Sequence, residues 1–295
     1  MALQNRRRSI SLNRQAVTKD RLTLEDFQAL RDFLEKHCGI NLAHNKRYLV
    51  QSRLESILSE SGCYSLREMI LGILGGSLPV TLRTRIIDAL TTNETFWFRE
   101  SKHFDFLQEH LLPHLSRQQF RTLRVWSAAC STGQEPYSLA ICAFEACRNG
   151  RIPRVNLRIV GTDLSRNALD TASRATYTDL SLSRGLTDEI KQRYFIPCGE
   201  GRKLKPEITN LVRFQQFNLL KPFEVLGKFD LIFCRNVLIY FSQETKTDIL
   251  QRMARALQPG GLLFLSNTES MPPGIDGLTI EHQAGIRYYR REGGD

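Results

Sequence analysis

Polar residues follow four apolar, β-branched runs at the points where those runs end, and they could bind a ligand. The first group is the turn at 127–136 (SAACSTGQEP), whose small residues let a ligand approach the backbone where a helix begins. The second ends in Asp163, whose carboxylate could accept hydrogen bonds from ribose hydroxyls. Asn218 follows the third run and could contact an adenine edge. Arg235 and Asn236 follow the fourth.

Each group taken alone also has a plain structural explanation. The turn at 127–136 matches neither G-x-G-x-x-G nor G-x-x-x-x-G-K-[ST], so it could be an ordinary tight strand-to-helix turn. Asp163 could simply cap the helix that follows it. Four polar strand ends together form a site more readily than any one of them. They favour an adenosine-containing ligand bound to an open α/β sheet.

Two stretches of the sequence with different patterns surround these residues. Residues 21–90 predict four helices, at about 23–39, 45–62, 65–74 and 79–90, with Thr23 as the first N-cap and Gly39 as the first stop signal. From about residue 120, strand-like runs alternate with helical segments at 134–149, 165–174 and 243–257. This alternation predicts a mostly parallel sheet with helices on both faces. The polar stretch 176–212 is either a small inserted subdomain or a long crossover.

Composition limits the function classes. The chain has 295 residues, 41% of them apolar, which favours two folded domains. No run reaches the roughly 18–20 apolar residues of a membrane span. The basic N-terminus lacks the apolar segment of a secretory signal. The seven Cys form no C-x-x-C pair, so we expect no metal site and a cytoplasmic protein. A net charge of +10 favours polyanionic partners such as nucleic acid, an anionic membrane or an acidic protein surface.

Six segments, in order, make the chain recognisable: TTNETFWFRE (91–100), RVWSAACSTGQEPYS (124–138), GTDLS, QRYF, FNLL and FDLIFCRNVLIYF (229–241). Across about residues 22–290 the sequence resembles the CheR family, the S-adenosylmethionine-dependent methyltransferases that esterify glutamates of bacterial chemoreceptors. The resemblance implies an α/β, Rossmann-like methyltransferase domain (120–295) with a small β-subdomain inserted at 176–212. It also implies an N-terminal all-helical domain (21–90) and a linker contributing to the cofactor site (91–119). The basic tail (1–20) lies outside the match, and its run of basic residues without acids predicts a disordered, solvated segment.

The same resemblance assigns the site residues. Those expected to contact S-adenosylmethionine, or the product S-adenosylhomocysteine, are Asn93, Thr95, Arg99, Glu135, Asp163, Asn218, Leu219, Arg235 and Asn236. Tyr240 matches a tyrosine near the transferred methyl group, and it is assigned a catalytic role together with Arg99. In plainer interpretations Arg99 forms a surface ion pair with Glu100, and Tyr240 is a core aromatic.

The expected partners are the cytoplasmic methylation helices of chemoreceptors, with the enzyme acting as a monomer in chemotaxis or a similar signalling pathway. Lys46, Arg47 and Arg53 match the basic residues that contact the receptor, although they could also form a solvated helix face. Glu55 and Ser56 stand where strongly basic relatives carry arginine. The short loop 198–202 disfavours docking of a receptor peptide on the β-subdomain.

The chemistry expected of such an enzyme needs neither a general base nor an enzyme nucleophile. A glutamate carboxylate is already ionised at pH 7, so alignment and desolvation are the main requirements. A nucleic-acid methyltransferase is a less favoured alternative, because the chain has neither a D/N-P-P-[YFW] segment nor a Pro-Cys nucleophile. A cofactor-binding module without turnover is the other alternative. We expect neither nucleic-acid binding nor membrane insertion.

Overall fold

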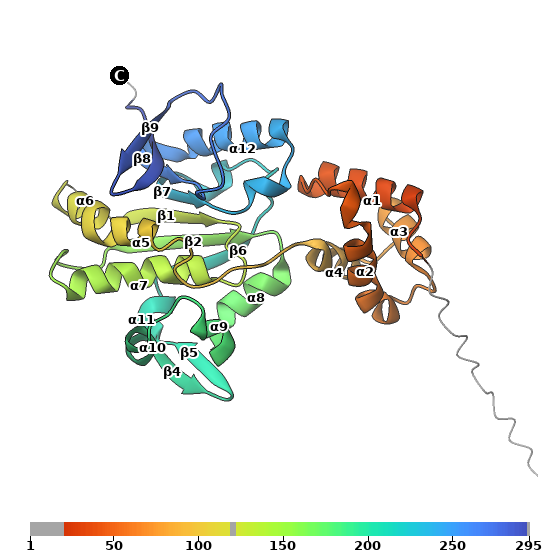
Figure 1. Cartoon of the computed structure of the whole chain (residues 1–295), viewed down its shortest axis with the longest axis horizontal. Helices are drawn as coiled ribbons and strands as arrows, with labels where there is room; N and C mark the ends of the chain where they lie inside the picture. The colour runs from red at the N-terminus through yellow and green to blue at the C-terminus, as the bar shows by residue number, and fades with distance from the viewer. Residues whose placement is uncertain (1–20, 119–121, 294–295) are drawn as a thin grey trace, which may run out of the picture.

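The computed structural model describes residues 21–118 and 122–293 (Figure 1). The basic tail predicted at 1–20 therefore lies outside the described residues. Within the described ranges, no helix combines the length and apolar character needed to cross a membrane.

Four helices form the N-terminal part: α1 (Leu24–Cys38), α2 (Arg47–Ser61), α3 (Leu66–Leu74) and α4 (Val80–Leu90). The Thr23 side chain accepts a hydrogen bond from the Asp26 N–H at the start of α1, and Gly39 ends this helix with φ 75°. Ser65 caps α3 in the same way. The buried sides of these helices share one apolar core that includes Phe27, Leu30, Leu54, Met69 and Ile86. All four helices predicted from the sequence are confirmed.

A seven-stranded sheet forms the second part, in the order β6-β2-β1-β7-β8-β10-β9. Its strands are β1 (Leu123–Ala128), β2 (Leu157–Asp163), β6 (Val212–Gln216), β7 (Phe229–Cys234), β8 (Leu257–Phe264), β9 (Leu278–Gln283) and β10 (Ile286–Arg291). The first five in the spatial order pair in parallel, and the last two pairings are antiparallel. The chain runs outward from β1 through β2 to β6 and then returns to β7 on the other side of β1. Ligands bind at such a reversal of strand order, outside the carboxyl ends of the strands.

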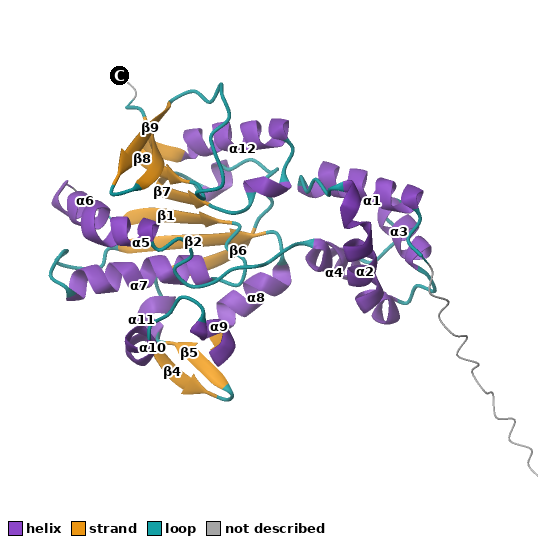
Figure 2. Cartoon of the chain, viewed as in Figure 1, coloured by secondary structure: helices purple, strands orange, loops and turns teal. Residues whose placement is uncertain are grey.

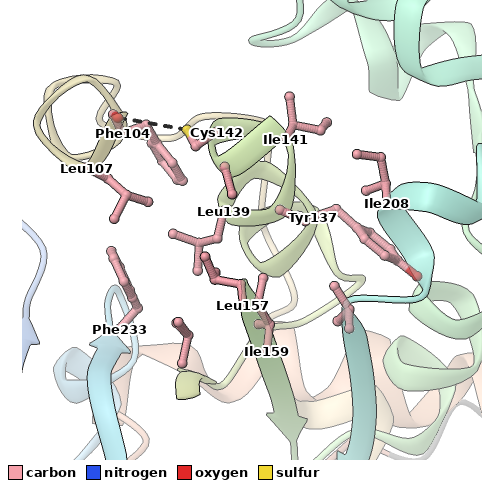
Figure 3. Packing of buried hydrophobic residues seen from close by; sticks show 14 of the residues in the cluster. Phe104, Leu107, Tyr137, Leu139, Ile141, Cys142, Leu157, Ile159, Ile208 and Phe233 are labelled. Carbon is pink, nitrogen blue, oxygen red and sulfur yellow. Dashed lines mark hydrogen bonds between the residues drawn. The ribbon is translucent and has the colours of Figure 1, made fainter. Parts of the chain in front are cut away.

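Helices cover both faces of this sheet (Figure 2). One face packs against α5 (Lys102–Phe106), the π-helical turn Leu107–Leu111, α6 (Leu112–Gln118) and α7 (Gln134–Arg148), and the other packs against α12 (Gln243–Ala256). Because side chains alternate along a strand, Leu231 and Phe233 of β7 belong to the first core and Ile232 to the second. Figure 3 shows the first core, in which Phe233 and Leu139 pack together with Leu157 of β2.

A small antiparallel sheet interrupts the chain between α8 (Arg166–Arg174) and β6. It has the order β3-β5-β4, with β3 (Thr176–Thr178), β4 (Phe195–Cys198) and β5 (Gly201–Leu204). Three short helices accompany it: α9 (Asp179–Ser183), α10 (Asp188–Tyr194) and α11 (Pro206–Thr209). Residues 176–212 thus contain an inserted subdomain and not a simple crossover. The predicted fold class is confirmed.

Outside the inserted subdomain, two segments of the second part differ from the sequence-based expectation. The sequence predicts a linker over 91–119, but residues 102–118 are helical and bury Phe104, Phe106, Leu107, Leu111 and Leu112 against the sheet. Their helical spacing was the available signal. Strand β9 is not predicted either, because all six of its residues are exposed or only partly buried and its pattern is weakly apolar.

Candidate functional site

A cavity of about 520 Å³ lies between the helical domain and the carboxyl edge of the sheet. Its volume falls in the range of about 300–1,000 Å³ that is usual for small-molecule sites. The residues predicted for the site come together here, with Arg47 alone among them outside the lining: Lys46, Arg53, Asn93, Thr95, Arg99, Glu135, Asp163, Asn218, Leu219, Arg235, Asn236 and Tyr240. Arg47 is exposed at the first position of α2.

Asp163 ends β2 with its carboxylate at the cavity. Its Oδ2 accepts the backbone N–H of Ser131 at 2.8 Å, and its Oδ1 accepts that of Ser165, also at 2.8 Å. Burial raises the pKa of this carboxyl above its ordinary value, although both hydrogen bonds oppose the rise. The N-cap of α8 is Ser165, whose hydroxyl accepts the Ala168 N–H. Asp163 is therefore not the capping residue, and each of its oxygens keeps a lone pair for a further donor.

The turn after β1 has an unusual backbone. Ala129 and Ser131 have φ values of 57° and 51°, a region that non-glycine residues seldom adopt. Gly133 has φ 93°, and a Cβ there would lie 2.8 Å from the Cβ of Ala172. Strained residues of this kind gather at binding sites, where the surrounding structure holds them. The turn is therefore more than an ordinary strand-to-helix connection. Within it, burial raises the pKa of the Cys130 thiol well above its usual range, so this cysteine is not a thiolate at neutral pH.

Arg235 follows β7 and has a fully buried guanidinium. Its Nη1 lies 2.9 Å from Oε2 of Glu135, and its Nη2 lies 3.0 Å from Oε2 of Glu100. The guanidinium also lies over the Phe104 ring at 5.6 Å from the centroid. Burial opposes ionisation of Glu100, but attraction to Arg235 and hydrogen bonds to its carboxylate outweigh burial and lower its pKa. Arg235 thus fixes the Glu135 carboxylate on the cavity wall.

Arg99 does not form the ion pair with Glu100 that the plainer interpretation suggested. Its Nη1 donates to the carbonyl oxygen of Glu94 at 3.3 Å, and its guanidinium lies over the Phe96 ring. Arg99 is one of the residues that line the cavity.

Asn236 has φ 58° and is held by a residue that the sequence did not suggest. Glu269 accepts the backbone N–H groups of Asn236 and Leu238, each at 2.8 Å. The side chain of Asn236 donates to Ser266 Oγ at 2.8 Å. Glu269 follows β8 in the segment SNTE, so polar residues at one more strand end were the signal that could have identified it.

The helical domain contributes backbone groups as well as side chains. The Asn41 N–H donates to the Tyr240 carbonyl at 2.7 Å, and the Asn218 side chain donates to the His37 carbonyl, also at 2.7 Å. Asn218 Oδ1 accepts the Leu220 N–H at 2.9 Å. Asn218 is therefore in direct contact with the last turn of α1, and Tyr240 is in contact with the segment that follows this helix.

The basic residues of α2 differ in their surroundings. Arg53 Nη1 donates to the carbonyl oxygens of Leu90 and Thr91, at 3.1 and 3.0 Å. Its guanidinium thus holds the end of α4 as well as bordering the cavity. Lys46 is exposed on the cavity rim, where its charge faces solvent.

Two family models match this chain. Residues 93–284 match the S-adenosylmethionine-binding domain of CheR methyltransferases, and residues 25–91 match their all-alpha domain. The chain belongs to the CheR methyltransferase family. It is 47% identical to Chemotaxis protein methyltransferase Cher2 of Pseudomonas putida, over 88% of this chain and 93% of that protein. Chemotaxis protein methyltransferase 1 of Pseudomonas aeruginosa is 48% identical, over 83% of this chain and 90% of the relative.

This CheR-family chain is a methyltransferase that uses S-adenosylmethionine. The donor set fits that cofactor. Asp163 retains acceptor capacity for ribose hydroxyls, and Glu135 adds a second carboxylate to the same wall. Two carboxylates complement a ligand that carries a sulfonium and an ammonium group.

Proposed function

We propose that this protein transfers a methyl group from S-adenosylmethionine to glutamate side-chain carboxylates on the cytoplasmic methylation helices of chemoreceptors. The observation that carries the proposal is a single cavity built by both domains. The methyltransferase domain contributes the carboxylates of Glu135 and Asp163, which form the catalytic wall, and the helical domain contributes Lys46 and Arg53, which form the helical wall. The catalytic wall suits the cationic cofactor, and the basic rim suits an acidic helix. The relatives named chemotaxis protein methyltransferases support the same assignment. We place the reaction in the cytoplasm, carried out by a monomer.

The proposed roles follow from the surroundings of each residue. Asp163 binds the ribose, and Asn93, Thr95, Glu135, Asn218, Leu219 and Asn236 complete the cofactor wall. Arg99, in the linker between the two domains, contacts bound S-adenosylmethionine and the substrate glutamate. Arg235 acts mainly through Glu135, because its guanidinium is paired with two carboxylates.

Bound S-adenosylmethionine supplies a methyl group that is already activated by the sulfonium. The chain then needs to align an ionised carboxylate and exclude water. No enzyme nucleophile is required, and the two cysteines of the lining, Cys38 and Cys130, are buried thiols whose pKa values are raised by burial. Tyr240 is half-buried at the cavity and orients the attacking carboxylate.

Incubation with methyl-labelled S-adenosylmethionine and purified receptor cytoplasmic fragments tests the proposal. Label should enter the fragment and leave it as methanol on treatment with alkali, because a carboxyl ester is hydrolysed there. A fragment whose methylation-region glutamates are replaced by alanine is the matched substrate control and should stay unlabelled. Alkali-stable label, or equal labelling of the control fragment, would contradict glutamate esterification.

A further inference from the structure

Asp88 lies outside the cavity lining but joins the two domains. It occupies the last turn of α4, and only 8% of its surface is exposed. Its Oδ1 accepts the Arg166 N–H at 3.2 Å, and its Oδ2 accepts the Asn167 N–H at 3.4 Å. These N–H groups belong to the first turn of α8 and have no acceptor within their own helix. A carboxylate of the helical domain therefore accepts the free backbone N–H groups at the start of α8, a helix of the methyltransferase domain.

The segment that Asp88 holds is continuous with the cofactor wall. Ser165 directly precedes Arg166, and its N–H donates to Asp163 Oδ1 at 2.8 Å. The other Asp163 oxygen accepts the Ser131 N–H. A shift at the start of α8 would therefore move the backbone donor that orients the Asp163 carboxylate.

A second series of hydrogen bonds connects Ser131 to Asp88 through the linker. The Ser131 hydroxyl donates to the Asn93 carbonyl at 2.8 Å. The Asn93 side chain donates to Thr91 Oγ1 at 3.4 Å, and this hydroxyl donates to the Asp88 carbonyl at 2.7 Å. Two routes thus lead from Asp88 to the cofactor wall, one through α8 and one through the linker, and they meet at the Ser131–Asp163 pair. A closed ring of this kind resists displacement of any one member.

We propose that Asp88 is a positioning residue for S-adenosylmethionine, fixing the segment 163–167 so that the Asp163 carboxylate is preorganised for the ribose. A negative charge at the start of α8 is favourable there, and it lies in a nearly buried setting. The inference rests on the proposed ribose contact of Asp163. It implies that docking of the helical domain and cofactor binding stabilise each other, since such coupling is reciprocal.

Calorimetric titration of the full chain with S-adenosylhomocysteine tests this role. Asp88→Ala should weaken binding about tenfold, because both backbone donors lose a charged acceptor. Asp88→Asn keeps one acceptor oxygen and should bind between Asp88→Ala and the wild type. Asp170→Ala is the matched control: it removes a carboxylate from α8, the helix whose start Asp88 holds, at a position where the side chain is 53% exposed and pairs with Arg166 at the surface. It should bind like the wild type.

Kinetics separate positioning from general damage. Asp88→Asn should raise KM for S-adenosylmethionine while kcat at saturation stays within about twofold. A merely structural lesion would lower the active fraction, and with it kcat, without raising KM. Wild-type affinity and KM in folded Asp88→Asn would overturn the inference, and this variant alone decides the matter if Asp88→Ala does not fold.

The variant Asp163→Ala distinguishes the proposed ribose contact of Asp163 from the positioning role of Asp88. Unchanged affinity in Asp163→Ala would refute the ribose contact itself. If Asp163→Ala binds weakly and Asp88→Ala binds normally, only the positioning role is refuted. The double variant should bind about as weakly as Asp163→Ala alone, because Asp88 acts through that carboxylate. Fully additive losses would contradict this coupling.

Discussion

Replacing Arg235 by methionine should destabilise the fold strongly at neutral pH. The change removes the guanidinium between Glu100 and Glu135 and leaves two carboxylates in a setting where their side chains are only 17% and 15% exposed. Breaking a buried ion pair costs about 3–5 kcal/mol. Ser266 and Ser127 still donate to these carboxylates. We therefore expect a loss near the lower end, about 3 kcal/mol.

The loss should depend on pH with a defined sign. In the wild type the Glu100 pKa is lowered, so its stabilising contribution is present above the ordinary value near 4.5 and disappears as the pH falls through the folded value. Without Arg235, burial opposes ionisation with less compensation, and the Glu100 pKa rises above that of the unfolded chain. The folded variant then binds a proton that the unfolded chain releases. Its deficit relative to the wild type should shrink between pH 7 and pH 5.

Urea unfolding monitored by tryptophan fluorescence measures this, because Trp97 and Trp126 are both buried. Arg85→Met is the control. It breaks an ion pair with Glu60 in which the two side chains are 42% and 62% exposed, and it should cost less than about 1 kcal/mol at either pH. A loss in Arg235→Met as small as that of the control, or a loss equal at both pH values, would refute the reasoning.

Four further outcomes are expected. Gly39→Ala should lower the thermal stability of the protein more than Gly62→Ala. Both glycines have positive φ, but of the two only Gly39 would bring a Cβ against a neighbour, the Phe241 ring at 2.8 Å. Equal losses in thermal unfolding would contradict this. Lys46→Glu should lower kcat/KM for receptor, and less so at 1 M salt, where the Debye length is about 3 Å; a salt-independent effect would exclude electrostatic docking. Tyr240→Phe should lower kcat with little change in cofactor affinity, and unchanged kinetics would leave it a packing residue. Burial, together with the nearby Arg235 charge, lowers the pKa of His103 to about 4. An NMR titration of this side chain should therefore show no step between pH 5 and 8, and a midpoint near 6.5 would contradict the expectation.

Local signals predicted much of the fold. Thr23 and Ser65 cap helices, and Gly39 ends one, through contacts within a few residues along the chain. The alternation of strands and helices after residue 120 likewise gave the parallel part of the sheet and its ligand-binding edge. Asp163 and Asn236 could be found because they lie at the carboxyl ends of apolar runs: Asp163 ends β2, and Asn236 is two residues beyond β7.

Partners distant in sequence were not predictable. Glu269 stands among polar residues at a strand end, but the sequence does not show that it holds the backbone of Asn236, 33 positions earlier. Asp88 reaches Arg166 across 78 positions, and a single sequence contains no record of that proximity. The family resemblance assigns Arg53 to the substrate, but its bonds to the carbonyls of Leu90 and Thr91 depend on how α2 and α4 pack. Such contacts emerge only from tertiary structure.

The pairing of β1 with β7, which comes much later in the chain, also sets the order in which the site can be completed during synthesis. Glu135 leaves the ribosome one hundred positions before its partner Arg235. At about 5–20 residues per second, that separation is roughly 5–20 s. During this interval Glu100 and Glu135 have no guanidinium between them, so both carboxylates are better kept in water than buried. The half-sheet of β1, β2 and β6 should therefore stay loosely packed on the side that later receives β7. A nascent chain halted before residue 235 should accordingly bind no cofactor and be readily cleaved by protease.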